Sequence, residues 1–184
     1  MIKFNPIILE TKEFSELIEQ SEKLTFKKKE IIVQPGKICN YLYLIKSGLL
    51  RSLYFDNKGN DITHWFALEN MLMTIPPGFF NREVSQFSLE AIEQTTVRAF
   101  SREMLDNAFE KHRIIETFCR VMVTQTMISL GQKVIDLQTK TAEERYEKLK
   151  ETHPNISTRA SLGQISSYLG ITQQSLSRIR SKNK

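Results

Sequence analysis

Side chains that can read nucleic acid bases lie close together near the C-terminal end of the sequence. Gln173 and Gln174 are followed by Arg178 in the segment TQQSLSRIRSK. A glutamine can form two hydrogen bonds with the edge of an adenine, and an arginine can do the same with a guanine. The residues that we expect on the base-facing side are Gln173, Gln174, Ser177, Arg178 and Arg180. Those that we expect to contact phosphate groups are Thr172, Ser175, Lys182 and, further upstream, Arg159.

The distribution of charge points to the same end of the chain. No Asp or Glu occurs from Thr152 to Lys184, and the five basic residues of that segment account for the whole net charge of +5. The rest of the sequence carries equal numbers of acidic and basic side chains. We therefore expect a polyanionic partner for this segment alone. The alternative is a basic end that is solvated and binds nothing.

Two short helices that cross at a steep angle would hold these side chains in place. Such a pair needs a small residue at the crossing and a glycine at the turn, and Ser166 and Gly170 occupy those positions. The expected recognition helix runs from Thr172, whose hydroxyl caps it, to Lys182. The residues expected on the buried side of the pair are Ile165, Leu169, Ile171, Leu176 and Ile179. A helical hairpin whose polar side is merely solvated would have the same pattern.

Residues up to about position 100 show the turn signals and alternation of a β-roll. Short apolar runs such as NYLYLIKSG and LLRSLYFDNKGND are separated by Pro35-Gly36, Ser47-Gly48 and the segment Asn57 to Asn60. Strands at this close spacing favour an antiparallel sandwich or roll. We expect a short amphipathic helix before them, from Glu13 to Gln20.

A helical period replaces this alternation from Glu103 to Leu137, which contains no Pro and a single Gly. Spacings of four and three residues there draw an apolar stripe, formed by Val123, Met127, Leu130, Val134 and Leu137. We expect this stripe to meet the same stripe of a second subunit about a two-fold axis. A second apolar face is expected to lie on the roll, and it consists of Ile114, Ile115, Phe118 and Met122. The alternative is that both faces belong to the core of one chain.

A further helix is predicted in TAEERYEKLKETHP, because acidic residues begin it, lysines follow and His153-Pro154 ends it. The link from Gln138 to Thr141 is a candidate hinge. The sequence thus predicts an α+β protein in three parts. We expect a β-roll over residues 1–108, a dimerisation helix over 109–138 and a helix-turn-helix domain over 139–184.

Composition and motifs argue against several classes of function. The N-terminal residues lack the apolar stretch of a signal peptide, and no window approaches the length of a membrane span, so we expect a cytoplasmic protein without a membrane partner. Cys39 and Cys119 fit a reducing compartment. We find no nucleophile motif and no glycine-rich phosphate loop, so we expect neither enzymatic activity nor a cofactor. His64, His112 and His153 lack the spacing of metal ligands, although a cupin-like metalloenzyme is an alternative for such a roll.

The chain resembles the Crp/Fnr family of transcription regulators over essentially its whole length. The segments that carry the resemblance are LYLIKSG and FDNKGND in the roll, the long helix, TAEERYEKL and SYLGITQQSLSRIR. The last two are the most specific, and they resemble family members common in Bacteroidetes. The resemblance implies a cyclic-nucleotide-binding type of roll, a dimerising helix and a winged-helix domain whose recognition helix enters the major groove of double-stranded DNA. It places Gln173, Gln174 and Arg178 at base-contacting positions and implies a homodimer, with RNA polymerase as a candidate partner.

The sequence departs from the family pattern in two places. Relatives that bind cyclic AMP carry Gly-Glu after a strand and an Arg-Ser or Arg-Thr pair after a short helix, whereas this chain has TIPP from Thr74 in the first place and Ser85 or Gln86 in the second. A cyclic phosphate would there be buried without partners, which costs several kcal/mol, so we do not expect control by cyclic AMP. The sequence also ends soon after Arg180, so we expect no wing strands behind the recognition helix.

The identity of any effector is left open by these residues. A loop arginine, Arg82, is the one basic side chain that could replace the missing one in the roll. The alternative function is therefore a sensor whose roll binds a cyclic nucleotide or an apolar small molecule. The apolar residues nearest the altered segment are Met71, Met73, Phe79 and Phe80.

Overall fold

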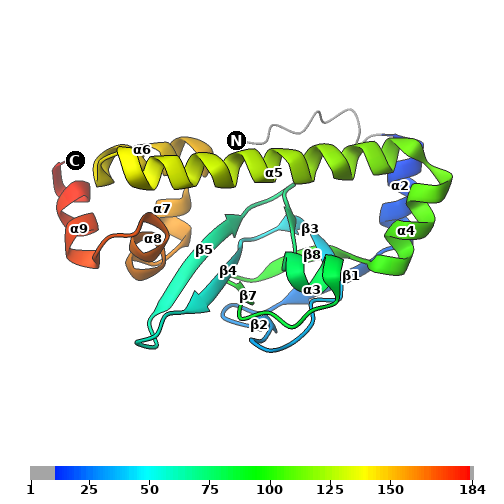
Figure 1. Ribbon diagram of the computed structural model, residues 1–184, viewed down its shortest axis with the longest axis horizontal. Coiled ribbons are helices and arrows are strands. Elements are labelled where there is room, and N and C mark those ends of the chain that lie inside the picture. Colours follow the sequence, from blue (N-terminus) through cyan, green and yellow to red (C-terminus); the bar gives the residue numbers. More distant parts are fainter. Residues whose placement is uncertain (1–10, 183–184) are drawn as a thin grey trace.

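The computed structural model describes residues 11–182, and in it a long helix runs along a β-roll and leads to a group of short helices (Figure 1). The roll consists of two four-stranded antiparallel sheets, as the sequence predicts. The first sheet contains, in spatial order, β1 (Glu22–Phe26), β8 (Thr95–Ser101), β3 (Tyr41–Ser47) and β6 (Leu72–Met73). The second contains β2 (Ile31–Val33), β7 (Ser88–Ala91), β4 (Leu50–Phe55) and β5 (Asp61–Ala67).

An apolar core fills the space between the two sheets. Ile45 of β3 pairs with Val97 of β8, and both side chains are fully buried against Leu50 and Leu89 of the second sheet. The neighbouring side chain Leu44 points to the opposite face of the first sheet, because successive residues of a strand alternate. This opposite face is also buried, so β3 is apolar on both sides.

Helices cover that opposite face at one end of the molecule. They are α2 (Lys12–Gln20), α4 (Arg102–Lys111) and the first half of α5 (Arg113–Thr139). Phe14 of α2 meets Phe118 of α5 edge to face, with ring centroids 5.2 Å apart, above Leu42 and Phe100 of the sheet. Ile115, Phe118 and Met122 are buried there, which confirms that this face of the long helix lies on the roll, but Ile114 is 37% exposed and does not belong to it.

The helical region that begins at Arg102 is not continuous. α4 ends at Lys111 and α5 begins at Arg113, with His112 in an extended conformation between them (φ −135°, ψ 93°). This break lies inside the segment for which the sequence predicts a single helical period. Neither Pro nor Gly marks it, so the turn that directs α5 along the roll has no local signal.

Four shorter helices follow at the other end: α6 (Ala142–Thr152), α7 (Ile156–Arg159), α8 (Leu162–Leu169) and α9 (Gln173–Lys182). α9 is the outermost element there, and α8 lies between it and β5 (Figure 1). A third apolar cluster joins these helices to the roll and includes Phe66, Leu49 and Ile92 from the strands and their connections. The remaining helix, α3 (Pro76–Asn81), lies in the connection between β6 and β7.

The connection between α5 and α6 is a single extended residue, Lys140, followed by the cap Thr141. The Thr141 hydroxyl accepts a hydrogen bond from the backbone of Glu144, and the Glu144 carboxylate accepts one from the backbone of Thr141. This reciprocal pair fixes the start of α6. The predicted helix in TAEERYEKLKET is therefore confirmed, and its first turn is capped. Within residues 11–182, no helix is both long and apolar enough to cross a membrane.

Candidate nucleic-acid interface

The turn between α8 and α9 is built by residues whose local preferences agree. Ser161 caps α8 and shares a reciprocal pair of hydrogen bonds with Gln164. Gly170 ends the helix in the left-handed conformation (φ 68°, ψ 37°), which costs a residue with a Cβ about 1 to 2 kcal/mol. The backbone N–H of Ile171 then donates to the carbonyl of Ser166. The predicted turn glycine is thus confirmed by its geometry.

The inner side of the helix pair is apolar and closely packed. Ile165 and Leu176 have no exposed surface, and Leu169 is 2% exposed. Ser166 is 3% exposed, which agrees with its predicted place where the two helices approach each other. Ile171 and Ile179 pack against the edge of the same cluster. These contacts fix the rotation of α9 about its own axis, and therefore decide which of its side chains point outward.

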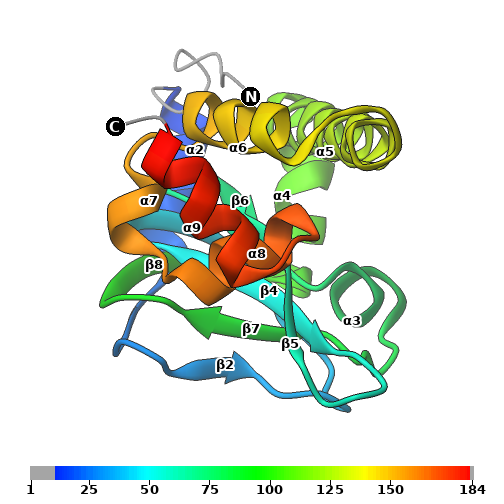
Figure 2. The ribbon, with the colours of Figure 1, turned by 90° about the vertical axis from the view of Figure 1, so that its left-hand side faces the viewer.

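Four of the five residues predicted to face bases are exposed on the outer side of α9: Gln173, Gln174, Ser177 and Arg178. Their spacing of one, three and one residues places them on one helix face. The Gln173 side chain lies over α8 and would be 3.3 Å from a Cβ added to Gly163. Within the described part of the chain, the guanidinium of Arg178 forms no hydrogen bond or ion pair. In Figure 2, α9 lies nearest the viewer, in front of α8 and the strands of the roll.

Three residues predicted to contact phosphate lie at the two ends of the same helix. The Thr172 hydroxyl accepts a hydrogen bond of 3.1 Å from the backbone N–H of Ser175, which confirms its predicted capping role. The hydroxyl oxygens of Thr172 and Ser175 are 2.9 Å apart. Lys182 is exposed in the last turn. The structure therefore keeps all three on the surface that also carries Gln173 and Arg178.

Arg180 does not lie on the exposed face where the sequence analysis places it. Its guanidinium carbon is 5.7 Å from the centre of the Tyr146 ring of α6, and its Nε and Nη2 atoms are buried without a hydrogen bond among the described residues. The cause is its position four residues after Leu176, which turns it by only about 40° from the buried side. Arg180 packs between helices instead of facing outward.

Arg159 also has partners that differ from the prediction. Its Nη2 lies 2.7 Å from Oε1 of Glu69 and 2.6 Å from Oε1 of Glu93, both of which belong to the roll. These hydrogen bonds to two carboxylates raise the pKa of Arg159 further above its usual value. In this arrangement the guanidinium is neutralised by the roll and is directed away from the exposed face of α9. The predicted phosphate contact does not agree with this conformation.

The helix pair is attached to β5 of the roll, a contact that sequence reasoning missed. The Ser167 hydroxyl accepts a hydrogen bond from the backbone N–H of Thr63 and donates one to the Thr63 hydroxyl, each 3.1 Å long. The rings of Phe66 and Tyr168 lie 5.1 Å apart. The Thr63 hydroxyl in turn accepts a bond from Arg51, whose buried guanidinium is also paired with Glu90. A serine and a tyrosine on a short helix give no signal of such a partner in the sequence.

A second surface lies on the outward side of α5. The predicted stripe is exposed at four of its five positions: Val123, Met127, Val134 and Leu137 are 54%, 66%, 55% and 44% exposed. Leu130 is partly buried. Ile135 is also more than half exposed, so the apolar surface is broader than the predicted stripe, whereas Ile128 and Leu137, although exposed, also line a cavity between α5 and α6. Gly131 lies among these residues, and a Cβ added to it would meet no atom within 4 Å.

At the place in the roll where the sequence resemblance would put a cyclic phosphate, Thr74 and Ile75 make contacts within the roll. The Thr74 hydroxyl donates to the carbonyl of Tyr41 and lies 3.4 Å from the sulfur of Cys39. Ile75 is 1% exposed. Arg82, the only basic candidate to replace the missing arginine, is exposed and donates to the side chain of Asn40. Arg82 therefore forms a hydrogen bond at the surface of the roll and not in its interior.

The histidines show no metal-site geometry. Nδ1 of His64 lies 3.4 Å from the Ser52 hydroxyl, and Nδ1 of His153 lies 2.9 Å from the Thr152 hydroxyl. Among residues 11–182, no group of three His, Cys, Asp or Glu side chains is arranged to hold a metal ion. The two histidines take part in ring packing against Phe87 and Phe66, respectively.

Comparison with known proteins agrees with this architecture. The family model of the cyclic nucleotide-binding domain matches residues 23–112. No curated protein matches the sequence. FixK2 from Bradyrhizobium japonicum superposes with a TM-score of 0.75 and 22% identity, over 88% of this chain and 83% of that chain. The c-di-GMP-responsive global regulator CLP of Xanthomonas campestris gives a TM-score of 0.70 and 14% identity, over 92% and 89% of the two chains.

A Crp/Fnr-family protein of Eubacterium rectale is similar to the same extent, with a TM-score of 0.70 and 16% identity over 93% of this chain and 82% of that chain. At these identities the likeness concerns the fold. Residues 23–112 thus match the cyclic nucleotide-binding domain family, and the chain has the fold of Crp/Fnr regulators, with a roll, a long helix and a C-terminal helix-turn-helix.

Proposed function

We propose that this chain is a sequence-specific DNA-binding transcription regulator of the Crp/Fnr type. The observation that carries the proposal is the exposure of Gln173, Gln174 and Arg178 on one face of a helix whose opposite side is fixed by buried Leu176. These side chains can form paired hydrogen bonds with adenine and guanine in the major groove. The likeness to gene regulators and the acid-free C-terminal segment support the same function.

Phosphate contacts complete the proposed interface. Thr172 and Ser175 supply hydroxyl groups beside the base-facing side chains, and Lys182 supplies a cation one turn further along. Contacts of this kind orient a helix on the duplex without reading sequence. The proposed DNA-binding region is residues 139–184, with the roll in 1–108 and the connecting helix in 109–138. RNA polymerase is the proposed further partner.

We infer that the protein acts as a homodimer joined along α5. The exposed apolar side chains of Met127 and Val134 would leave water on pairing with a second copy, which favours association by about 25 cal/mol per Å² of apolar surface. A two-fold arrangement of this helix would present two α9 helices to half-sites about 34 Å apart on DNA.

Control by cyclic AMP is not part of the proposal. The Thr74 hydroxyl donates to the roll's own backbone, Ile75 has no polar side chain, and Arg82 is exposed and donates to Asn40 at the surface, which argues against a buried phosphate here. The alternative, a roll that binds a cyclic nucleotide or an apolar effector, is favoured by the family match of residues 23–112. Calorimetric titration with cyclic AMP and cyclic GMP separates the two, because a saturating isotherm would support the alternative.

Selection from random duplexes tests the main proposal. The full-length protein is incubated with a library of random double-stranded DNA, and bound fragments are recovered and sequenced over several rounds. A sequence-specific dimer is expected to enrich an inverted repeat with half-site centres about one helical turn apart. Recovery of fragments without any common sequence would refute base reading by α9.

A further inference from the structure

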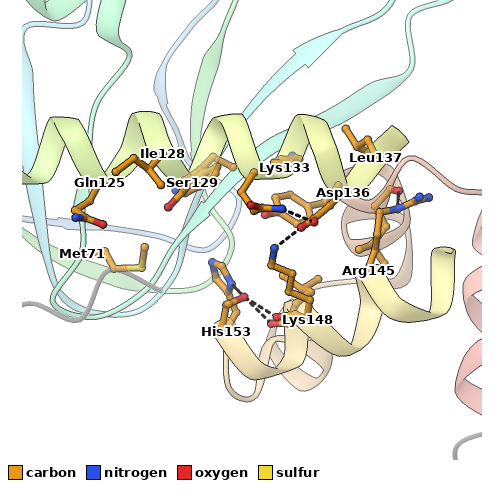
Figure 3. Close-up of a pocket in the computed structure, with 16 residues that line it drawn as sticks. Met71, Gln125, Ile128, Ser129, Lys133, Asp136, Leu137, Arg145, Lys148 and His153 are labelled. Atoms are coloured by element: carbon orange, nitrogen blue, oxygen red, sulfur yellow. Dashed lines mark hydrogen bonds and ion pairs between the residues drawn. The ribbon is translucent and has the colours of Figure 1, made fainter. Parts of the chain in front are cut away.

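A cavity lies at the junction of α5, α6, α8 and the roll (Figure 3). Its volume is about 290 Å³, close to the lower end of the range of small-molecule sites. In Figure 3 the upper wall is α5, with Ile128 and Lys133, and the lower wall is α6, with Lys148. Trp65 and Met71 of the roll also line it.

One lysine of this cavity has no counter-ion. The Nζ of Lys133 donates to the carbonyl oxygen of His64 at 2.7 Å and lies 3.7 Å from the centre of the Tyr168 ring. No carboxylate of the described residues forms an ion pair with it, and burial lowers its pKa to about 8. Because this value is above neutral pH, most of the molecules still carry the positive charge.

The nearest acidic side chain of the cavity is already neutralised. Asp136 is 6% exposed and forms ion pairs with Lys148 and with Lys140, the latter at 3.5 Å. It also accepts a hydrogen bond of 2.9 Å from Gln132. The remaining cation, Arg145, donates to the backbone carbonyls of Leu169 and Lys140. Positive charge therefore exceeds negative charge around the cavity, and Lys133 and Arg145 are the two lining cations that form no ion pair with a carboxylate of the described residues.

The rest of the lining is largely apolar or aromatic. Trp65 and Met71 come from the roll, Leu149 from α6, and Tyr168 from α8. A site that combines an apolar wall with a buried ammonium group that has no carboxylate partner favours a ligand with an apolar body and a negative charge. We propose that this cavity binds a small organic carboxylate, whose anionic group pairs with Lys133 and whose apolar body packs against Trp65 and Met71.

Occupancy of the cavity would alter contacts that hold three elements together. Lys133 joins α5 to β5 through the His64 carbonyl and to α8 through the Tyr168 ring. A carboxylate that forms an ion pair with this ammonium group would weaken both contacts. It would therefore change how the helix pair packs on the roll. This consequence rests on the proposed function, whereas binding itself does not.

Trp65 is the single tryptophan of the chain, so its fluorescence reports on this cavity without DNA. The full-length protein is titrated at neutral pH with benzoate and 3-phenylpropionate, and separately with the uncharged benzamide and 3-phenylpropionamide. We expect a saturable change in Trp65 emission with at least one of the acids and an affinity about ten- to hundredfold lower for its amide, as for loss of one charged hydrogen bond.

Substitution of Lys133 tests whether this side chain binds the carboxylate of the ligand. Lys133→Met is expected to lower the affinity for the acid by about tenfold or more and to leave that for the amide unchanged, whereas Lys133→Arg keeps the preference for the acid. Lys46→Met, at an exposed lysine of the roll, is the matched control and should bind as the parent does. Calorimetry repeats each titration independently of fluorescence. Equal affinity for acid and amide, unchanged binding by Lys133→Met, or no binding of either acid would overturn the proposal.

Discussion

Nη2 of Arg159 lies 2.7 Å from Oε1 of Glu69, a residue 90 positions earlier in the chain. The same guanidinium reaches Glu93, so one side chain from α7 joins two carboxylates of the roll. The carboxylate of Glu69 also accepts a hydrogen bond from the backbone of Gly48. This cluster, together with the bonds between Ser167 and Thr63, holds the helix pair against the sheet.

Loss of the ion pairs of Arg159 should destabilise the packing of the C-terminal helices on the roll. The side chains exposed on α9 should stay the same. We expect Arg159→Met to lower the free energy of unfolding by about 1 to 2 kcal/mol, a value between those of exposed and buried pairs because the carboxylates are about one-third exposed. Urea denaturation measures the loss. In a double-mutant cycle with Glu69→Gln the two effects should be less than additive, and full additivity would show that the two side chains do not interact.

The conformation of Gly170 gives a second prediction. Gly170→Ala places a Cβ in the left-handed region and 3.4 Å from Cδ2 of Leu137, so we expect a loss of about 1 to 2 kcal/mol in the free energy of unfolding. Gly131→Ala is the matched control, because Gly131 is helical and an added Cβ meets nothing. In a variant that does not dimerise, Gly131→Ala should raise the free energy of unfolding by up to about 1 kcal/mol. Equal effects of the two substitutions would contradict this account of the turn.

The outer face of α5 predicts the oligomeric state. Met127→Glu should convert the dimer to a monomer, because a carboxylate would be buried at the seam without a partner, while the fold of the single chain is unaffected at a position that is 66% exposed. Sedimentation equilibrium measures the mass, and circular dichroism checks the fold. Gln34→Glu adds the same charge at an exposed position of the roll and should leave the mass unchanged. A parent protein that is monomeric at high concentration would exclude the dimer.

The buried ring of His153 predicts how stability depends on pH. Burial lowers its pKa from 6.5 to about 4, so between these values the unfolded chain binds a proton that the folded chain does not. Stability should therefore fall as the pH falls, by about 1.4 kcal/mol per unit in that window. The pKa of His64 is also lowered by burial, and it contributes with the same sign.

Denaturation at pH 5 and pH 7 tests this dependence. His153→Gln should reduce the difference between the two free energies of unfolding by about 2 kcal/mol, since it removes one of the groups that is buried in its neutral form. The parent protein, measured at the same two pH values, is the reference. An unaltered pH dependence in His153→Gln would show that this ring is not responsible.

The elements that could be predicted from the sequence are those fixed by neighbours in the chain. Gly170 and Leu176 are within a few residues of the turn and core that they form, so their types and spacing identify them. The alternation of the strands likewise predicts the roll. His112, by contrast, interrupts a helical period with no Pro or Gly, because the turn is set by packing of α4 and α5 on the sheet.

The side chains that were misplaced are those whose partners are distant in sequence. The sequence analysis places Arg180 with Arg178 on the outer face of the expected helix and assigns Arg159 to a phosphate contact. The positions of Arg159 and Arg180 depend on Glu69 and on Tyr146, respectively, which no local pattern connects to them. The cavity beside Lys133 was missed for the same reason, since its walls come from α5, α6, α8 and the roll.

Binding of the selected duplex by variants of α9 tests the central claim most directly. Affinities of the parent, Arg178→Ala and Lys182→Ala are measured by fluorescence anisotropy on the enriched duplex and on a scrambled duplex, at several salt concentrations. Arg178→Ala should lose about 1 to 3 kcal/mol on the enriched duplex and much less on the scrambled one, whereas Lys182→Ala should lose similar amounts on both and lower the salt slope by about one. Equal losses of Arg178→Ala on both duplexes would contradict base reading by this helix.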